Sequence, residues 1–120
     1  MIFPKPGATP RNELAADQAV LKAGHLRFGR DLAQQVFQGE LQAKIAFDAD
    51  KKCFVLCKAS LMTLNMRYPK PAPIMIKQRN LNGELSINVQ EWILDHDLPE
   101  NHSELALTWE ERVNLLTIQL

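Results

Sequence analysis

The alternation of apolar and polar residues predicts two similar pairs of short strands along the chain. Residues 26–28 and 85–87 alternate apolar and polar positions, and each run follows a glycine, Gly24 or Gly83. Alternation with a period of two is typical of a half-buried strand, and glycine tolerates the tight turns that join strands. Asn82 with Gly83 is the stronger turn signal of the two. Residues 19–23 read as a helix end or as a strand, and the β-rich stretch 74–78 before Gly83 favours the strand.

Apolar residues at helical spacing predict a short helix after each pair of strands. The apolar stripe of the first helix consists of Leu32, Ala33, Val36 and Phe37. In the second half, Asn88 is placed to cap a helix whose apolar face is Val89, Trp92 and Ile93. A further helix is expected over residues 10–19, because Thr9 can cap it and Pro10 suits its first position.

Each half then ends in an apolar hairpin with a polar, charged turn. The expected strands are residues 43–47 with 53–58, and residues 104–109 with 113–120. The connection between the halves carries Pro69, Pro71 and Pro73, which favour an extended backbone. Just before these prolines, one helical turn is expected to cover apolar surface with Leu61, Leu64 and Met66.

The two halves align with each other at a nearly constant spacing. Residues 45–56 match residues 105–116 at an offset of 60, and the block at Gly24 matches the block at Gly83 at an offset of 59. We interpret this as an internal duplication, although the low identity leaves chance similarity as an alternative. The expected organisation is an arm and helix (1–19), a first repeat (20–59), a proline-rich connection (60–73) and a second repeat (74–120), forming one compact domain. One copy of about 40 residues is too small to bury a core by itself.

Composition and charge narrow the class of protein. The chain has 120 residues, 46% hydrophobic and 23% charged, which is typical of a globular protein in water. It has no apolar run of about 18 residues and no signal-peptide pattern, so we expect a cytoplasmic location and no membrane partner. The net charge is zero, but residues 1–60 carry +3 and residues 61–120 carry −3. This asymmetry fits one half that meets a polyanion, two copies that attract head to tail, or an accident of composition.

Few residues suggest site chemistry. Cys53 and Cys57 would lie on the same face of one strand about 13 Å apart, too far for a disulfide, so we expect buried free thiols. The run Asp95-His96-Asp97, with His102 and Glu104 nearby, includes possible metal ligands, but its position at a helix end favours solvation and capping. Motifs for catalysis or phosphate binding are lacking, so we expect neither an enzyme nor a cofactor.

The order of strand, turn with glycine, strand, short helix and hairpin resembles the swapped-hairpin DNA-binding superfamily of AbrB-like regulators, MazE-type antitoxins and tandem MraZ proteins. The resemblance is carried by Gly24-His25-Leu26-Arg27-Phe28-Gly29 and by Gly83-Glu84-Leu85-Ser86-Ile87-Asn88, with the helix after each. It implies a mainly β fold with short helices, of the α+β class, in which two interleaved repeats form a pseudo-twofold swapped-hairpin barrel. The chain departs from the family pattern after each glycine, where His25 and Glu84 stand in place of arginine.

The resemblance implies a DNA-binding transcriptional regulator or an antitoxin-like protein. Its expected contacts with duplex DNA are Lys22, His25, Arg27, Arg30, Lys77 and Arg79. The same positions are also compatible with a solvated polar face of alternating strands. The alternative function is a protein-interaction or assembly module on the same scaffold, whose partner is another protein or a second copy of the chain.

Overall fold

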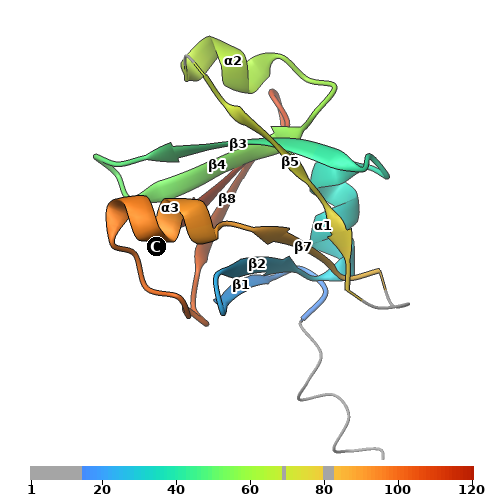
Figure 1. The fold of residues 1–120 in the computed structure, drawn as a ribbon. Coiled ribbons are helices and arrows are strands. Elements are labelled where there is room, and N and C mark those ends of the chain that lie inside the picture. The colour runs from blue at the N-terminus through green and yellow to red at the C-terminus, as the bar shows by residue number, and fades with distance from the viewer. Residues whose placement is uncertain (1–14, 69, 80–82) are drawn as a thin grey trace, which may run out of the picture.

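The computed structural model describes residues 15–68, 70–79 and 83–120, and more of its residues lie in strands than in helices (Figure 1). The four-stranded sheet has the order β1 (Ala19–Lys22), β2 (His25–Phe28), β7 (Leu85–Asn88), β6 (Lys77–Gln78). The five-stranded sheet has the order β5 (Ala72–Met75), β3 (Gln42–Asp48), β4 (Cys53–Lys58), β9 (Leu115–Gln119), β8 (Ala106–Glu110). The helices are α1 (Arg30–Phe37), α2 (Thr63–Arg67) and α3 (Gln90–His96). The expected mainly β class with short helices is therefore confirmed.

The first strand pair forms as the alternation predicts. β1 and β2 are joined by Ala23 and Gly24, whose φ angles of 51° and 78° are those of a type I′ turn. The expected helix over residues 10–19 is wrong where it can be judged, because residues 15–18 form a turn and Ala19 begins β1. Its first part, like the turn residue Asn82, lies outside the described residues. Tertiary contacts override helix propensity here, since the Ala16 carbonyl accepts the N–H groups of Asp31 and Leu32 at 2.9 Å.

The main core lies between the two sheets, and α1 and α3 close opposite ends of the space between them (Figure 1). All four residues of the predicted α1 stripe are buried. At this end, the rings of Phe28 and Phe37 pack edge to face at 5.2 Å between centroids. At the other end, Phe54 on β4 meets Trp92 on α3 at 6.3 Å.

A second, smaller core lies on the outer face of the five-stranded sheet. The short helix α2 covers it and inserts the fully buried Leu64. Cys53 and Cys57 lie beneath this helix as buried free thiols, as the sequence predicts. Met66 differs from the prediction, because its side chain is 84% exposed instead of covering apolar surface.

The expected swapped-hairpin barrel does not close. The described strands form two separate antiparallel sheets, and no strand ladder joins the edges of one sheet to those of the other. The break falls at Ile76, which separates β5 in one sheet from β6 in the other. α1 and α3 fill the open ends, so burial of the core does not require a continuous barrel.

Both sheets have a symmetric strand order. If β1 is exchanged with β6 and β2 with β7, the strand order of the four-stranded sheet is the same order read from the opposite edge. The same is true of β3, β4, β9 and β8 in the five-stranded sheet when β3 is exchanged with β8 and β4 with β9. In the β2–β7 ladder, Arg27 lies opposite Ser86, the residue 59 positions later. In the β4–β9 ladder, Val55 lies opposite Thr117, the residue 62 positions later, and 62 is also the offset between the equivalent strand ends Asp48 and Glu110.

Candidate nucleic-acid interface

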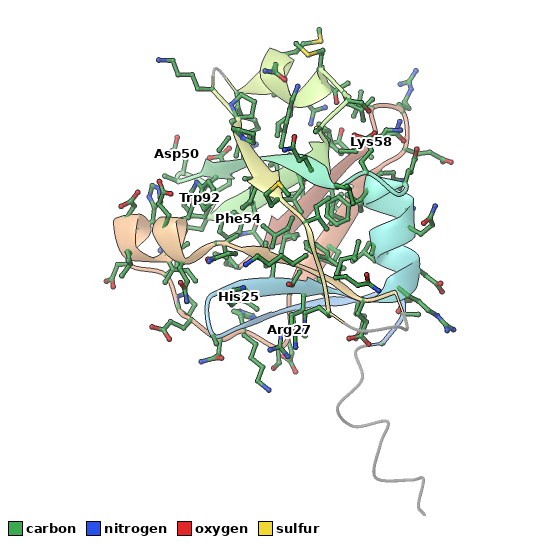
Figure 2. All side chains as sticks on the ribbon, turned by 45° about the vertical axis from the view of Figure 1, so that its right-hand side comes forward. His25, Arg27, Asp50, Phe54, Lys58 and Trp92 are labelled. Atoms are coloured by element: carbon green, nitrogen blue, oxygen red, sulfur yellow. The ribbon has the colours of Figure 1, made fainter. Side chains whose placement is uncertain are left out.

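The four-stranded sheet turns one face to the core; on its other face the centre is covered, with Ser86 4% and Glu84 9% exposed, and the exposed positions lie toward the edges. Leu21, Leu26 and Ile87 are buried on the inner face, so the residues that alternate with them point outward. Five of the six expected cations occupy outward positions: Lys22 on β1, His25 and Arg27 on β2, Lys77 on β6 and Arg79 just after it. Figure 2 shows His25 and Arg27 on the side of the molecule away from Phe54 and Trp92.

Strand register sets the spacing of these side chains. Arg27 is paired with Val20 on one side and with Ser86 on the other, and Ser86 is paired with Lys77. This row crosses all four strands, so its ends are about 14 Å apart at the usual strand spacing. A second row runs from Lys22 through His25 towards β7. Cations from both halves of the chain therefore share one surface.

Arg27 occupies the middle of this surface and is half-buried. Partial burial and the neighbouring Arg79 lower the pKa of Arg27, whereas Glu84 acts in the opposite direction. Its Nε atom is enclosed and makes no hydrogen bond within the described part of the chain. The Arg27 guanidinium remains charged at neutral pH because arginine has a very high intrinsic pKa.

Acidic residues limit the positive potential of this face. Glu84 is 9% exposed, and its backbone carbonyl accepts the N–H of Arg79 at 2.8 Å. The segment that carries Glu100 and Glu104 runs along the outer edge of β1, where His102 and Leu21 exchange backbone hydrogen bonds of 2.9 and 2.7 Å. Sequence reasoning missed this second acidic contribution, because β1 and this segment are some 80 residues apart in the chain.

Arg30, the sixth expected contact, does not lie with the other five. It begins α1 and lines an open pocket of about 320 Å³ beside Gly83 and Gln78, at the side of the sheet. Its Nε lies 3.8 Å from the carboxylate of the neighbouring Asp31. The spacing in sequence suggested one cluster with Arg27, but the turn from strand to helix at Gly29 separates the two side chains.

The run Asp95-His96-Asp97 forms the C-terminal end of α3 and is exposed. The His96 ring stacks on Phe47 with centroids 4.5 Å apart, and Asp97 ends the helix in the left-handed conformation with a φ of 53°. In the described part of the chain, no three His, Cys, Asp or Glu side chains come close enough to hold a metal ion. Within this run, Asp97 ends α3 and His96 packs against Phe47.

An ion pair on the opposite side of the molecule was also missed. Arg67 on α2 and Glu110 on β8 form a bidentate pair, with distances of 2.7 and 2.9 Å. The pair raises the pKa of Arg67 and lowers the pKa of Glu110. No local pattern predicts it, since the two residues are 43 positions apart.

Comparison with known proteins adds no relative: the chain matches no family model, no curated protein and no solved structure. None of the described helices is long and apolar enough to cross a membrane. Any functional conclusion therefore depends on the geometry described above.

Proposed function

We propose that the chain binds duplex DNA through the outward face of the four-stranded sheet, as a two-repeat protein of the swapped-hairpin type. One observation carries the proposal: Lys22, His25, Arg27, Lys77 and Arg79, drawn from both halves of the chain, point from one sheet face. Lysine and arginine side chains that neutralise phosphates release condensed counterions, which is the main source of affinity for DNA.

The contacts between the two halves support the duplicated, interleaved arrangement. A Cβ at Gly24 in the first turn would collide with Gln90, the first residue of α3. A Cβ at Gly83 in the second half would lie 3.2 Å from Cβ of Arg30, the first residue of α1. Each turn glycine thus packs against the start of the other half's helix, as expected when two repeats exchange hairpins.

The size of the cationic face also suits DNA. The row through Arg27 spans about 14 Å, and the major groove is about 12 Å wide. Lysines near opposite edges of the sheet can therefore reach phosphates on both sides of one groove, while Arg27 lies over its centre. Because Glu84, Glu100 and Glu104 reduce the positive potential, we propose weak, strongly salt-dependent binding.

A fluorescence-anisotropy titration with labelled duplexes of about 20 base pairs tests the proposal at several salt concentrations. With roughly four phosphate contacts, the logarithm of the binding constant should fall with log salt at a slope of about −3 to −4. The triple variant Lys22→Ala/Lys77→Ala/Arg79→Ala should bind at least about tenfold more weakly and with a slope smaller by 2 to 3.

The chain offers a charge-matched control. Lys51, Lys70 and Arg112 are exposed and lie outside the four-stranded sheet. The variant Lys51→Ala/Lys70→Ala/Arg112→Ala changes the net charge by the same amount and should keep the affinity and slope of the parent protein. Equal losses in the two triple variants would mean that net charge, not this face, drives binding, and a lack of binding at low salt would exclude the proposal.

A second candidate function is protein interaction through α2. Met62 and Met66, four positions apart at this helix, are 62% and 84% exposed. Exposed methionines are common on surfaces that adapt to apolar partners. Analytical sedimentation of the parent chain and of the variant Met62→Gln/Met66→Gln tests self-association through α2. A dimer that is lost in the variant supports this role. A monomer in both proteins means that α2 does not bind a second copy of the chain.

A further inference from the structure

Four described strands lie at the edges of the two sheets, and β8 has the least protected edge. β6 has only two residues, and β5 carries Pro73, which lacks the N–H that a further strand requires. β1 exchanges backbone hydrogen bonds with His102 through Leu21. β8 has five residues without proline and pairs with β9 but with no other described strand. Proteins usually blunt such edges, so an unprotected one indicates a partner that supplies a strand.

The side chains of β8 are covered less than those of the equivalent strand β3. Asp48 and Glu110 end these two strands, so Ile45 corresponds to Leu107. Ile45, which is flanked by Ala72 of β5, is 1% exposed, whereas Leu107 at the open edge is only half-buried. A further strand beside β8 would therefore bury apolar surface that the described part of the chain leaves accessible.

The hydrogen-bond pattern shows which backbone groups of β8 point to the open edge. The N–H of Leu120 donates to the carbonyl of Lys52 at 3.2 Å, so these opposite residues form a hydrogen-bonded pair in continuation of the β4–β9 ladder. Such pairs alternate along an antiparallel ladder, so the backbone groups of Thr117 point the other way, to its partner Thr108 on β8. The two neighbours of Thr108 consequently direct their N–H and C=O groups to the open edge.

The β8 edge is complementary to itself in one antiparallel register. When two copies of β8 pair about a twofold axis at Thr108, all five residues of one strand lie opposite residues of the other. Leu107 then lies opposite Trp109 of the second copy, so the outward backbone groups of both residues meet. Their side chains, which pack against the main core, pair on the inner face of the sheet. The two threonines on the axis also form a favourable cross-strand pair.

Charged residues beyond the ends of β8 fit the same register. It brings Glu104, two residues before β8, towards Arg112 of the second copy, in the turn after β8. Both side chains are exposed, and neither forms an ion pair within the described part of the chain. The twofold axis repeats this contact, so the dimer gains two pairs of opposite charge. With the axis at Leu107 instead, Glu104 would lie opposite Glu110, a like charge.

We propose that two copies of this chain associate through their β8 edges to form a twofold dimer, with five strands from each copy in one continuous sheet. Backbone hydrogen bonds at the edge, the pairing of Leu107 with Trp109 of the second copy and the contact of Glu104 with Arg112 stabilise the dimer. Twofold dimers are the commonest symmetric assembly and use the same surface on both subunits. The proposal is independent of DNA binding and of the methionines on α2.

Sedimentation equilibrium of the full chain over a range of concentrations tests the dimer. The parent should show a reversible equilibrium between monomer and dimer. Glu104→Arg and Arg112→Glu each place like charges opposite each other at two symmetric positions, so each variant should raise the dimer dissociation constant at least about tenfold. The double variant Glu104→Arg/Arg112→Glu should recover the affinity of the parent, because it exchanges the two charges.

A mixture of variants separates this edge from other surfaces. The two single variants, mixed in equal amounts, should form a heterodimer, since each charge then meets its opposite. The variant Met62→Gln/Met66→Gln should dimerise like the parent, because these methionines take no part in the contact. A parent chain that stays monomeric up to about 1 mM, or a dimer that the single charge reversals leave unchanged, would overturn the proposal.

Amide hydrogen exchange resolved by NMR shows whether the edge itself is covered. The amides of Leu107 and Trp109 should exchange at least about tenfold more slowly in the concentrated parent than in Thr108→Lys, which places two like charges on the twofold axis. Thr108 is exposed, so this variant should fold normally, and the amide of Phe54 on β4 should exchange at the same rate in both proteins. Slow exchange of the two edge amides in a monomer would mean that one chain covers its own edge, and the proposal would be wrong.

Discussion

Leu56 on β4 lies directly opposite Leu116 on β9, and both side chains are fully buried in the main core. Leu56 belongs to the hairpin of the first half of the chain and Leu116 to the hairpin of the second half. The centre of the five-stranded sheet is therefore formed where the two halves meet, and neither half contains this part of the core alone.

Truncation of either leucine should destabilise the whole domain. We expect Leu56→Ala and Leu116→Ala each to lower the free energy of unfolding by about 2–5 kcal/mol, because each removes buried methyl groups and leaves a cavity. Leu94 on α3 is 81% exposed, so Leu94→Ala should change the free energy by no more than about 0.5 kcal/mol. Urea unfolding measures all three. Two separate transitions, only one of which responds to a given leucine, would contradict a shared core.

Gly24 should be intolerant of a side chain for two separable reasons. Its φ of 78° disfavours other residues, and a Cβ would collide with Gln90. Gly39 has a similar φ of 83° but open space around the Cβ position. We expect Gly39→Ala to cost about 1–2 kcal/mol from backbone strain alone and Gly24→Ala to cost more. Thermal unfolding measures the two variants, and equal losses would mean that the contact between the halves contributes little.

Local patterns predicted the elements of this fold where one face of a strand or helix is buried. The alternation at Leu26 and Phe28 and the stripe on α1 both correspond to buried residues. Gly24 ends β1 in the turn that the sequence indicates. These features depend on neighbouring residues, which is why a single sequence reveals them.

Features that depend on distant contacts were not predictable. Residues 15–18 form a turn because the Ala16 carbonyl accepts N–H groups at the start of α1, not because of their own propensities. The separation of Arg30 from Arg27 and the presence of Glu104 beside β1 likewise follow from the tertiary arrangement. The sequence alignment at an offset of 60 also misplaces the second hairpin turn by two residues. In the structure Asp48 and Glu110 end equivalent strands, and these residues are 62 positions apart.

The two thiols should be unreactive in the folded protein. Burial raises the pKa of Cys53 and of Cys57, and Asp48 adds to the shift at Cys53. Because the thiolate is the reactive form, both residues should react with Ellman's reagent more than about tenfold more slowly near pH 8 than in denaturant. Rapid labelling of one thiol under native conditions would indicate that α2 opens from the sheet.

The ion pair between Arg67 and Glu110 should give a small stabilisation that depends on pH. Both side chains are partly exposed, at 46% and 36%, so a double-mutant cycle with Arg67→Ala and Glu110→Ala should give a coupling of about 0.2–1 kcal/mol near neutral pH. The folded-state pKa of Glu110 is lowered, so the coupling is present above its unfolded pKa of about 4.3 and is lost as pH falls through the folded value. A coupling that persists undiminished at about pH 2 would contradict this assignment.

The most direct test of the cationic face is an NMR titration of the chain with duplex DNA at low salt. The account predicts that amide shifts change on the four-stranded sheet, at residues 20–22, 25–27, 77–79 and 86, and remain constant on α2 and the β3–β4 turn. Shift changes that centre on Met62 and Met66, or no changes at all, would contradict it.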